Sequence, residues 1–351
     1  MKNILSIVLL SVVIFVSCQK EKTNEDQKAP EEVASTFDST ALATTSVDDN
    51  EDQSFLFRYK FTPGESFKYR LTTISEREQS ITTDSTISDN LSQTIIFIIN
   101  FKTLSLDADS VAELECTFSS VNLKANANGI AVNYQSGAKM DSTERQKFPE
   151  YESLLNNTFS MRVGKQGEII DIYKIDKIMN KFLSMRGLLD SLTAQDKVMA
   201  QQDLTNRSIK PLLAQIFREV PEQRMAKDST WSYKRESLPI MVFQVDYENL
   251  YKVESLEMLG DEKLAVISGV VKTNVSGKQT HSERGISYKF NKPITTAGGK
   301  IYFNLNKGLI HKSRSQTNLQ NSYTMEMPTP EGVQKASAKE VSSNINVIEL
   351  L

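Results

Sequence analysis

The sequence predicts a β-rich α+β fold, with two related, curved antiparallel sheets and a helical insertion between them. Three observations lead to this expectation. Apolar and polar side chains alternate over much of the chain after residue 54, which is the period of a half-buried strand. The period changes to that of a helix between residues 174 and 226. Short strand-turn-strand motifs recur in the same order before and after this helical part.

The alternating segments are separated by polar turns, which favours antiparallel neighbours over parallel crossover units. The first of them places Phe55, Phe57, Tyr59 and Phe61 on one face of an expected strand. The segments expected as strands before the helical part are 55–61, 66–75, 93–106, 110–120 and 131–134. Those after it are 231–233, 242–256, 263–275, 285–290, 300–305 and 309–327, with a closing strand through Ile345 and Val347.

Three helices are expected in the middle of the chain. Residues 176–192 carry apolar side chains at helical spacing. Thr193 and Asp196 have the spacing of a capping box that opens a second helix, and a break is expected near Asn206. Pro211 suits the first turn of a third helix. The apolar stripes predict packing on the sheet; docking of a partner helix or a membrane is the alternative.

Three pairs of segments suggest that the two β regions are degenerate copies of each other. Residues 64–69 parallel 228–233, residues 105–112 parallel 257–265, and residues 160–170 parallel 302–310. The alternative is that hairpins share turn chemistry without common descent. The predicted organisation is a signal peptide (1–17), a lipidated cysteine with a disordered acidic tether (18–54), a first β half (55–173), a helical segment (174–226) and a second β half (227–351).

The N-terminus predicts export and lipidation. A short positive segment, Met1-Lys2-Asn3, precedes a charge-free apolar stretch over residues 4–16. Phe15-Val16-Ser17-Cys18 then resembles the lipobox of bacterial lipoproteins, with Phe15 in place of the usual Leu. The resemblance implies cleavage before Cys18 and lipid on that cysteine, anchoring the protein to the outer membrane of a Gram-negative bacterium. The alternative is an ordinary secretory signal followed by a chance cysteine.

The segment after Cys18 is acidic. Residues 19–54 carry three lysines and ten acids, and such a composition predicts a disordered, self-repelling tether. The residues 18–22 also resemble the short export signal that sends some lipoproteins to the cell surface, and attachment on the periplasmic side is the alternative. The second cysteine, Cys116, lies in an expected strand and is interpreted as a buried, inert thiol.

The body of the chain resembles uncharacterised Gram-negative envelope lipoproteins that begin with a Gly-Glu-x-Phe-x-Tyr strand, here residues 64–69. More distantly, it is similar to the half-barrels of lipoprotein carriers and related lipid-binding proteins. Neither resemblance brings catalytic residues to this chain. The resemblance to the half-barrels implies instead a curved sheet that holds a ligand in its concavity.

The sequence offers little catalytic chemistry. His281 and His311 have no His, Cys or paired acid at ligand spacing, so neither a metal site nor a cofactor is expected. Nucleophile elbow, P-loop and dinucleotide-binding glycine patterns are missing, and Gly298-Gly299 is interpreted as a turn. Enzymatic activity stays uncertain but is not favoured.

Two biased features are candidate sites. Asp-Ser followed by Thr, Val or Leu resembles the acceptor motif for O-glycosylation of exported proteins, with local turns and caps as the alternative. The serines concerned are Ser39, Ser85, Ser110, Ser142, Ser191 and Ser229.

The second feature is charge, since residues 263–325 contain ten bases and one acid. Strand alternation would place five of the bases on one anion-binding face: Lys272, Lys278, Lys300, Lys312 and Arg314. Lysine protection of strand edges against aggregation is the alternative.

These observations favour a non-catalytic binding module for a lipid, glycan or amphipathic ligand, anchored to the cell envelope by its lipid. The alternatives are a structural or assembly lipoprotein that binds other envelope proteins, and a hydrolase. The expected partners are the membrane and such a ligand, with no nucleic acid.

Overall fold

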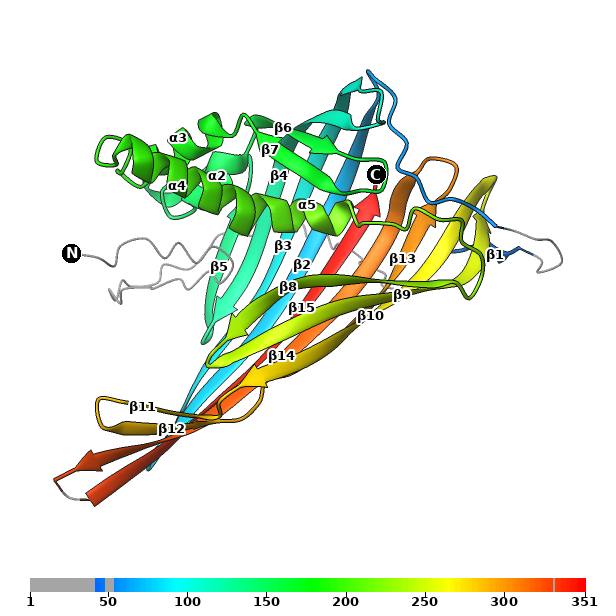
Figure 1. Ribbon diagram of the computed structural model, residues 1–351. Helices are drawn as coiled ribbons and strands as arrows, with labels where there is room; N and C mark the ends of the chain where they lie inside the picture. Colours follow the sequence, from blue (N-terminus) through cyan, green and yellow to red (C-terminus); the bar gives the residue numbers. More distant parts are fainter. Residues whose placement is uncertain (1–41, 48–53, 331) are drawn as a thin grey trace.

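The structure is a computed structural model that describes residues 42–47, 54–330 and 332–351. Over these residues the chain is β-rich, as predicted, and its strands form one antiparallel sheet of 15 strands that is not closed into a barrel. The strands are long and the sheet curves, so that β8 and β9 stand in front of β15 (Figure 1).

The strands before the helical part follow one another across the sheet, each hydrogen-bonded to the next along the path β2-β3-β4-β6-β7. β5 pairs with the remaining length of β4. The bounds of these strands are β2 (Ser66–Thr82), β3 (Thr86–Leu106), β4 (Ala112–Ala127), β5 (Ile130–Gln135), β6 (Thr158–Val163) and β7 (Ile169–Tyr173).

The strands after the helical part also follow one another, along the path β8-β9-β10-β13-β14-β15. A small hairpin of β11 and β12 leaves this path and returns to pair with β14. The bounds are β8 (Thr230–Ile240), β9 (Phe243–Leu259), β10 (Glu262–Gly277), β11 (Thr280–Glu283), β12 (Ile286–Phe290), β13 (Ile294–Asn304), β14 (Leu309–Thr329) and β15 (Gly332–Leu350).

The expectation of two separate sheets is wrong. The last strand, β15, pairs with β14 on one side and with β2 on the other, so Val347 lies between Arg314 and Thr72. The C-terminal strand therefore joins the two halves into one sheet. Pairing between residues more than 270 positions apart leaves no local pattern in a sequence.

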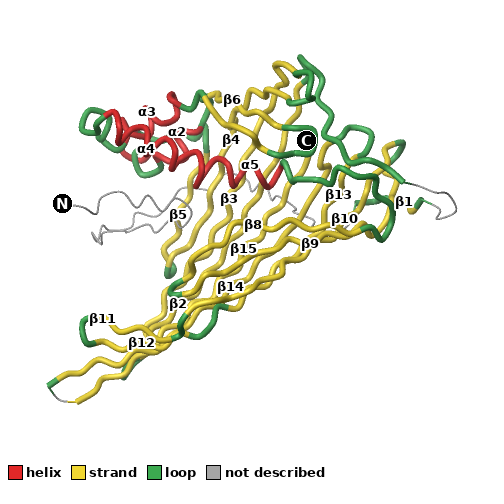
Figure 2. The backbone as a smooth tube through the Cα atoms, viewed as in Figure 1, coloured by secondary structure: helices red, strands yellow, loops and turns green. Residues whose placement is uncertain are grey.

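The helices lie together at one end of the sheet (Figure 2). Their bounds are α1 (Ser142–Arg145), α2 (Pro149–Leu154), α3 (Asp176–Met185), α4 (Ala194–Leu204), the π-helical turn η1 (Thr205–Ile209) and α5 (Lys210–Ile216). The predicted capping box is confirmed, because Thr193 and Asp196 exchange side-chain-to-backbone hydrogen bonds at the start of α4. The break predicted near Asn206 is wrong, since η1 carries the helix on into α5.

The strand predicted over residues 55–61 is also wrong, although its burial pattern is right. Phe57, Tyr59 and Phe61 are buried, but the segment pairs only through one isolated bridge, Phe55 to Met225. Its other backbone hydrogen bonds go to turns: Tyr59 N donates to Lys165 O and Lys60 N to Gly308 O. The segment is extended and half-buried without belonging to the sheet.

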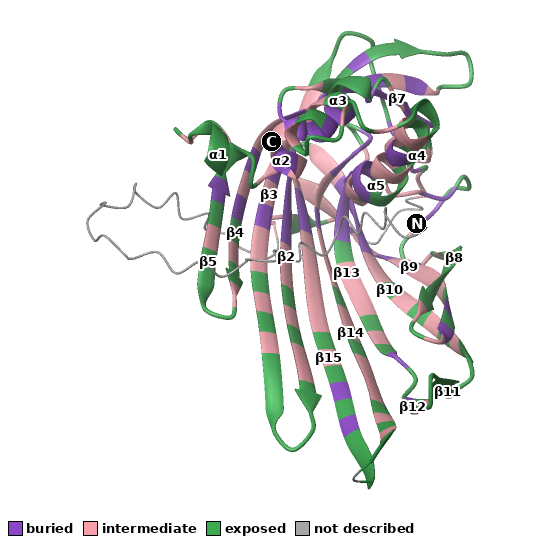
Figure 3. Cartoon of the chain, turned by 90° about the vertical axis from the view of Figure 1, so that its left-hand side faces the viewer, coloured by how far each residue is buried: buried purple, intermediate pink, exposed green. Residues whose placement is uncertain are grey.

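The main core lies between the helices and one face of the sheet, which we call the inner face. Phe217, just after α5, packs edge-on against Phe101 of β3 at 5.3 Å, and Phe57 packs against Phe303 of β13 at 5.2 Å. Buried residues are concentrated at the helical end of the strands, whereas the far ends are largely exposed (Figure 3). Cys116 is fully buried in this core, as predicted, and burial raises the pKa of its thiol.

Part of the predicted tether is ordered on the sheet. Residues 45–46 form β1 (Thr45–Ser46), which pairs with Met258 and Glu257 of β9. Leu42 packs against Leu264, Val266 and Tyr302 on the face opposite the helices, which we call the outer face. The signal peptide, Cys18 and the rest of the tether lie outside the described residues. Among the residues that are described, none belongs to a helix long and apolar enough to cross a membrane.

Candidate functional site

Alternation along β13 and β14 separates the two faces of the sheet. Ile301 and Phe303 point to the inner face and belong to the main core. Lys300 and Tyr302 therefore point to the outer face, because neighbouring side chains of a strand lie on opposite faces. The register pairs Lys300 with Arg314 and Tyr302 with Lys312, so these four side chains share the outer face.

An open hollow of about 590 Å³ lies on this outer face, over β13 and β14. We call it the outer hollow, and its lining residues are Thr296, Ala297, Gly298, Gly299, Lys300, Tyr302, Lys312, Arg314, Gln316 and Asn318. Gly298 pairs with Gln316 and presents no side chain, so the backbone forms the floor at this point. The interpretation of Gly298-Gly299 as a turn is wrong, because both residues lie within β13.

The outer hollow is positively charged. Lys300, Lys312 and Arg314 line it, and none of the described lining residues is acidic. Glu349 of β15 is a carboxylate beside Lys312, at 3.8 Å, and it is also paired with Arg70 at 3.3 Å. Two cations thus share that carboxylate, and the local excess of positive charge persists.

A chain of neutral hydrogen-bonding groups completes the lining. Arg314 Nη2 donates to Gln316 Oε1, and Gln316 Nε2 donates to Asn318 Oδ1, each at a distance of 3.3 Å. Asn318 Nδ2 in turn donates to Thr296 Oγ1 at 3.3 Å. These bonds are longer than the usual 2.9–3.0 Å, so each can be exchanged for a ligand at modest cost.

The structure brings three of the five predicted anion-binding residues together in the outer hollow. Lys272 lies on the same face of β10, four residues beyond Ser268, which pairs with Lys300, and it is opposite Glu248. Lys278 follows the end of β10 and lies outside the hollow. Thr296, Gln316 and Asn318 were not predicted. Polar residues at every second position of 312–318 could have indicated Gln316 and Asn318, whereas Thr296 lies on another strand.

The Asp-Ser motifs lie at turns and helix starts. Ser85 and Ser110 are in turns between strands, Ser142 opens α1, and Ser191 and Ser229 lie in loops. Asp141 caps α1 through a capping box, and Ser229 Oγ accepts from Ala226 N at 2.9 Å, which are roles of the local hydrogen-bonding alternative. Ser39 lies outside the described residues, and O-glycosylation stays a prediction.

The two histidines, His281 and His311, lie within the described part of the chain. No group of three or more His, Cys, Asp or Glu within metal-binding reach occurs among the residues that the structure describes. His311 lies in the bulge between β13 and β14, beside Lys307 and Glu262. Its pKa is lowered, mainly by burial and then by the positive charge of Lys307, against the opposing charge of Glu262.

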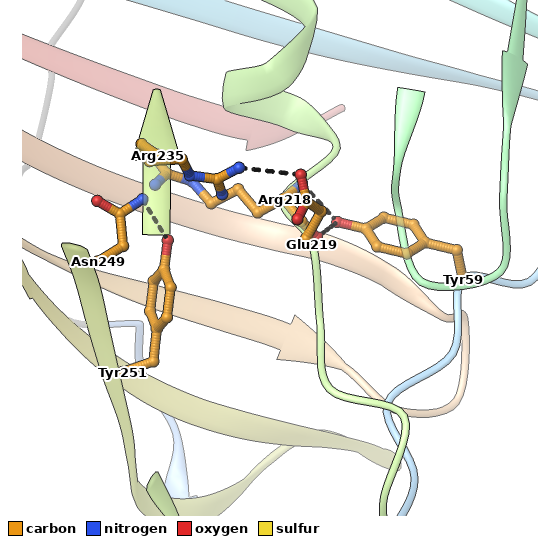
Figure 4. A network of polar contacts seen from close by, with 6 residues as sticks. All are labelled: Tyr59, Arg218, Glu219, Arg235, Asn249 and Tyr251. Carbon is orange, nitrogen blue, oxygen red and sulfur yellow. Dashed lines mark hydrogen bonds and ion pairs between the residues drawn. The ribbon is translucent and has the colours of Figure 1, made fainter. Parts of the chain in front are cut away.

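A second polar cluster lies on the inner side and is shown in Figure 4. Tyr59 donates through its hydroxyl to Arg218 O and accepts from Arg218 N, both at 3.0 Å. Arg235 of β8 pairs with Glu219 at 3.0 Å, and Asn249 Nδ2 donates to Tyr251 Oη at 3.4 Å. The charges of Arg235 and Glu219 neutralise each other. The cluster therefore connects the segment after α5 to β8 and to residues 54–65, which precede β2 and which we call the 54–65 segment. It offers fewer unpaired charges to a ligand than the outer hollow does.

No curated protein matches the chain. Among solved structures, it is similar to lipovitellin, described for its lipid–protein interactions, with 12% identity and a TM-score of 0.39 over 83% of this chain. The chain spans only 25% of the length of that lipovitellin chain.

Two outer membrane proteins of Pseudomonas show a weaker likeness. A channel from Pseudomonas putida F1 has 8% identity and a TM-score of 0.18, covering 87% of this chain and 100% of its own. OpdQ from Pseudomonas aeruginosa has 6% identity and a TM-score of 0.17, covering 81% and 99%. TM-scores this low carry no argument about function.

A protein family described as a family of unknown function (DUF6263) matches residues 109–310. The match runs from the start of β4 to the start of β14, and it includes all the helices and the β13 side of the outer hollow. It covers more than half of the sequence. The chain therefore belongs to the DUF6263 family.

Proposed function

We propose that this protein is a non-catalytic binding module of the cell envelope that holds an anionic ligand in the outer hollow. The observation that carries the proposal is the lining itself: three cations and a chain of amide and hydroxyl groups, with no acid among the described lining residues. Such a surface offers fixed positive charge and many hydrogen bonds, which suit a phosphate or carboxylate group. The ligand class is an anionic lipid headgroup or an acidic glycan.

The proposal includes attachment to the outer membrane through lipid on Cys18. About 24 residues separate Cys18 from Leu42, a length that spans at most roughly 80 Å. Because Leu42 packs against the cluster of Leu264, Val266 and Tyr302, the chain reaches the folded domain beside the outer hollow. Ligands at the membrane surface that carries the anchor are therefore within reach of the hollow.

Binding is tested with protein that begins at residue 18 and carries Cys18→Ala, so that neither the lipid nor the apolar segment 4–16 can contribute. We expect it to bind vesicles containing phosphatidylglycerol more strongly than pure phosphatidylcholine vesicles, and less strongly as salt rises. The triple change Lys300→Gln, Lys312→Gln and Arg314→Gln should abolish the preference, whereas Lys289→Gln, on β12, should keep it. Equal binding of the wild type to both kinds of vesicle, and to phosphorylated and neutral glycans, would refute the proposal.

The anchor is tested separately. Cys18→Ala should abolish fatty-acid labelling and release the protein from the membrane fraction, since lipid chains supply hydrophobic anchoring. A wild-type protein that is membrane-bound but never labelled would exclude the lipid anchor and leave the outer hollow unaffected.

We also propose that the two β regions are related copies. The paths β2-β3-β4-β6-β7 and β8-β9-β10-β13-β14 have the same order of neighbours, and each leaves out the small strands inserted after its third strand. The three matching sequence motifs fall at the same steps of the two paths: before the first strand, between the second and third, and between the last two. Superposition of the two halves at high coverage is the expected outcome.

A further inference from the structure

An apolar strip lies beside the outer hollow on the same face of the sheet. Residues that pair across neighbouring strands form a row perpendicular to the strands. The row that starts at Arg314 of β14 passes through Val347 of β15 and Thr72 of β2 and reaches Ile96 of β3. The next row runs from Gln316 through Ile345 to Ile74. On the other side, the row from Lys312 reaches Ile98 through the ion pair of Glu349 and Arg70. We call the partly exposed members of this set the isoleucine strip: Ile74, Ile96, Ile98 and Ile345. Val347 and Thr72 lie in the same part of the sheet but are buried.

The strip is not part of the main core. Its residues point to the outer face, while their neighbours Leu71, Phe97 and Ile348 point inward and are buried in the core. The four isoleucines are only partly buried. β-branched apolar residues fit a strand, but four of them in adjacent rows form a contiguous surface that favours contact with another apolar group.

The inner face is a poor place for an acyl chain. Near the helices it is filled by side chains of the protein itself, such as Phe57, Phe217 and Phe303. Farther along the strands it becomes polar, where Thr73 Oγ1 donates to Asn346 Oδ1 at 2.9 Å and Ser315 accepts from Arg218. A hydrocarbon chain there would remove these groups from water without replacing their bonds.

We infer that the ligand of the outer hollow is an anionic lipid, with its phosphate among Lys300, Lys312 and Arg314 and its acyl chain along the isoleucine strip. The inference rests on the proposed function and specifies its ligand. Three strand spacings separate Arg314 from Ile96, or roughly 14 Å, enough for a substantial part of an acyl chain. Charge complementarity fixes the direction, because the cations stand at one end of the strip.

The experiment compares two soluble probes, sn-glycerol 3-phosphate and dihexanoyl phosphatidic acid below its micelle concentration. Binding to protein that begins at residue 18 and carries Cys18→Ala is measured by titration calorimetry. We expect the acyl chains to raise the affinity at least tenfold, about 1.4 kcal/mol, which corresponds to fewer than two fully buried methylene groups. The double change Ile74→Thr and Ile96→Thr should reduce this ratio to about one.

Val341→Thr provides the matched control. Val341 lies on the outer face of β15 two rows beyond Ile345, and it is 38% exposed, so its replacement should leave both affinities unchanged. If the wild type binds both probes equally, the lipid inference is overturned and the proposed anion site stands. If it binds neither probe, the lipid inference is overturned, and the comparison of phosphorylated with neutral glycans decides the proposed anion site. The two wild-type titrations decide the matter even where a strip variant fails to fold.

Discussion

At the scale of single residues, Gly308 shows how one position allows residues 58–60 to pack closely against the turn between β13 and β14. It lies in the turn between β13 and β14 with a φ of +64°, where an L side chain is strained. A Cβ added there would lie 2.6 Å from both Arg58 O and Lys60 N, which are backbone atoms and cannot rotate away. The turn therefore needs glycine both for its own conformation and for the approach of residues 58–60.

Gly308→Ala should lower the free energy of unfolding by more than the strain of the left-handed conformation alone, which is about 1–3 kcal/mol. Gly64→Ala is the matched control, because Gly64 has a φ of +88° but no atom within 4 Å of an added Cβ. Urea unfolding of the two variants measures the difference. Equal losses in both would show that the contact with Arg58 and Lys60 contributes nothing.

His311 should make the stability of the folded protein depend on pH at values above those at which the carboxyl groups titrate. Burial, Lys307 and Lys312 lower its pKa from the ordinary value of 6.5, so the folded state favours the neutral imidazole. A depressed pKa contributes stability above pH 6.5 that is lost as the pH falls through the folded value. Glu113 and Glu262 also have lowered pKa values, but their contributions are lost only below their ordinary value of 4.5.

Between pH 6.5 and 4.5, therefore, the decline in stability should come chiefly from His311. The melting temperature of the wild type should fall over this range, and that of His311→Gln should fall less. The measurement is a series of thermal unfolding curves at constant ionic strength. Parallel declines in the two proteins would assign the effect to other groups.

At the scale of elements, alternation predicted burial better than it predicted pairing. The strands β2, β3 and β4 were found because one face of each carries buried apolar residues. The same pattern over 55–61 gave the correct buried residues, Phe57, Tyr59 and Phe61, but no strand. An extended segment that packs against turns has the same period as a strand, and the sequence does not reveal which backbone groups it pairs with.

The 54–65 segment should nevertheless stabilise the fold as strongly as a core strand. Phe57 is fully buried and contacts Phe55, Trp231 and Phe303, so Phe57→Ala should cost about 3–5 kcal/mol. Leu56 is the control on the other side of the segment, where it is 40% exposed, and Leu56→Ala should cost far less. Chemical denaturation of both variants checks the contrast. Similar small losses would mean that the segment is a surface strap.

At the scale of the whole molecule, the single sheet depends on contacts that no local pattern encodes. The pairing of β15 with β2 connects the two ends of the folded chain, and it places Val347 and Ile345 beside Thr72 and Ile74. The isoleucine strip exists only because of this order of strands, whereas the outer hollow lies on the neighbouring strands β13 and β14. The basic residues of the hollow could be predicted from charge and alternation, whereas its apolar neighbour could not, because it combines residues of the β2–β3 hairpin with residues of the distant strand β15.

The uneven placement of the core predicts a gradient of stability along the strands. Residues of β3 near the helices, such as Ile99 and Phe101, are buried on the inner face and paired with both β2 and β4. At the other end, Ile87 is 72% exposed, and residues 86–90 pair with β2 but lie beyond the ladder with β4, which begins at Leu91. Backbone hydrogen bonds with few apolar contacts and one neighbouring strand open at low free-energy cost.

Amides of residues 97–101 should therefore exchange with deuterium at rates set by global unfolding, and amides of residues 86–90 much faster. Hydrogen exchange resolved along β3 measures this directly, and uniform protection over the strand would show that some contact outside the described core stabilises its far end.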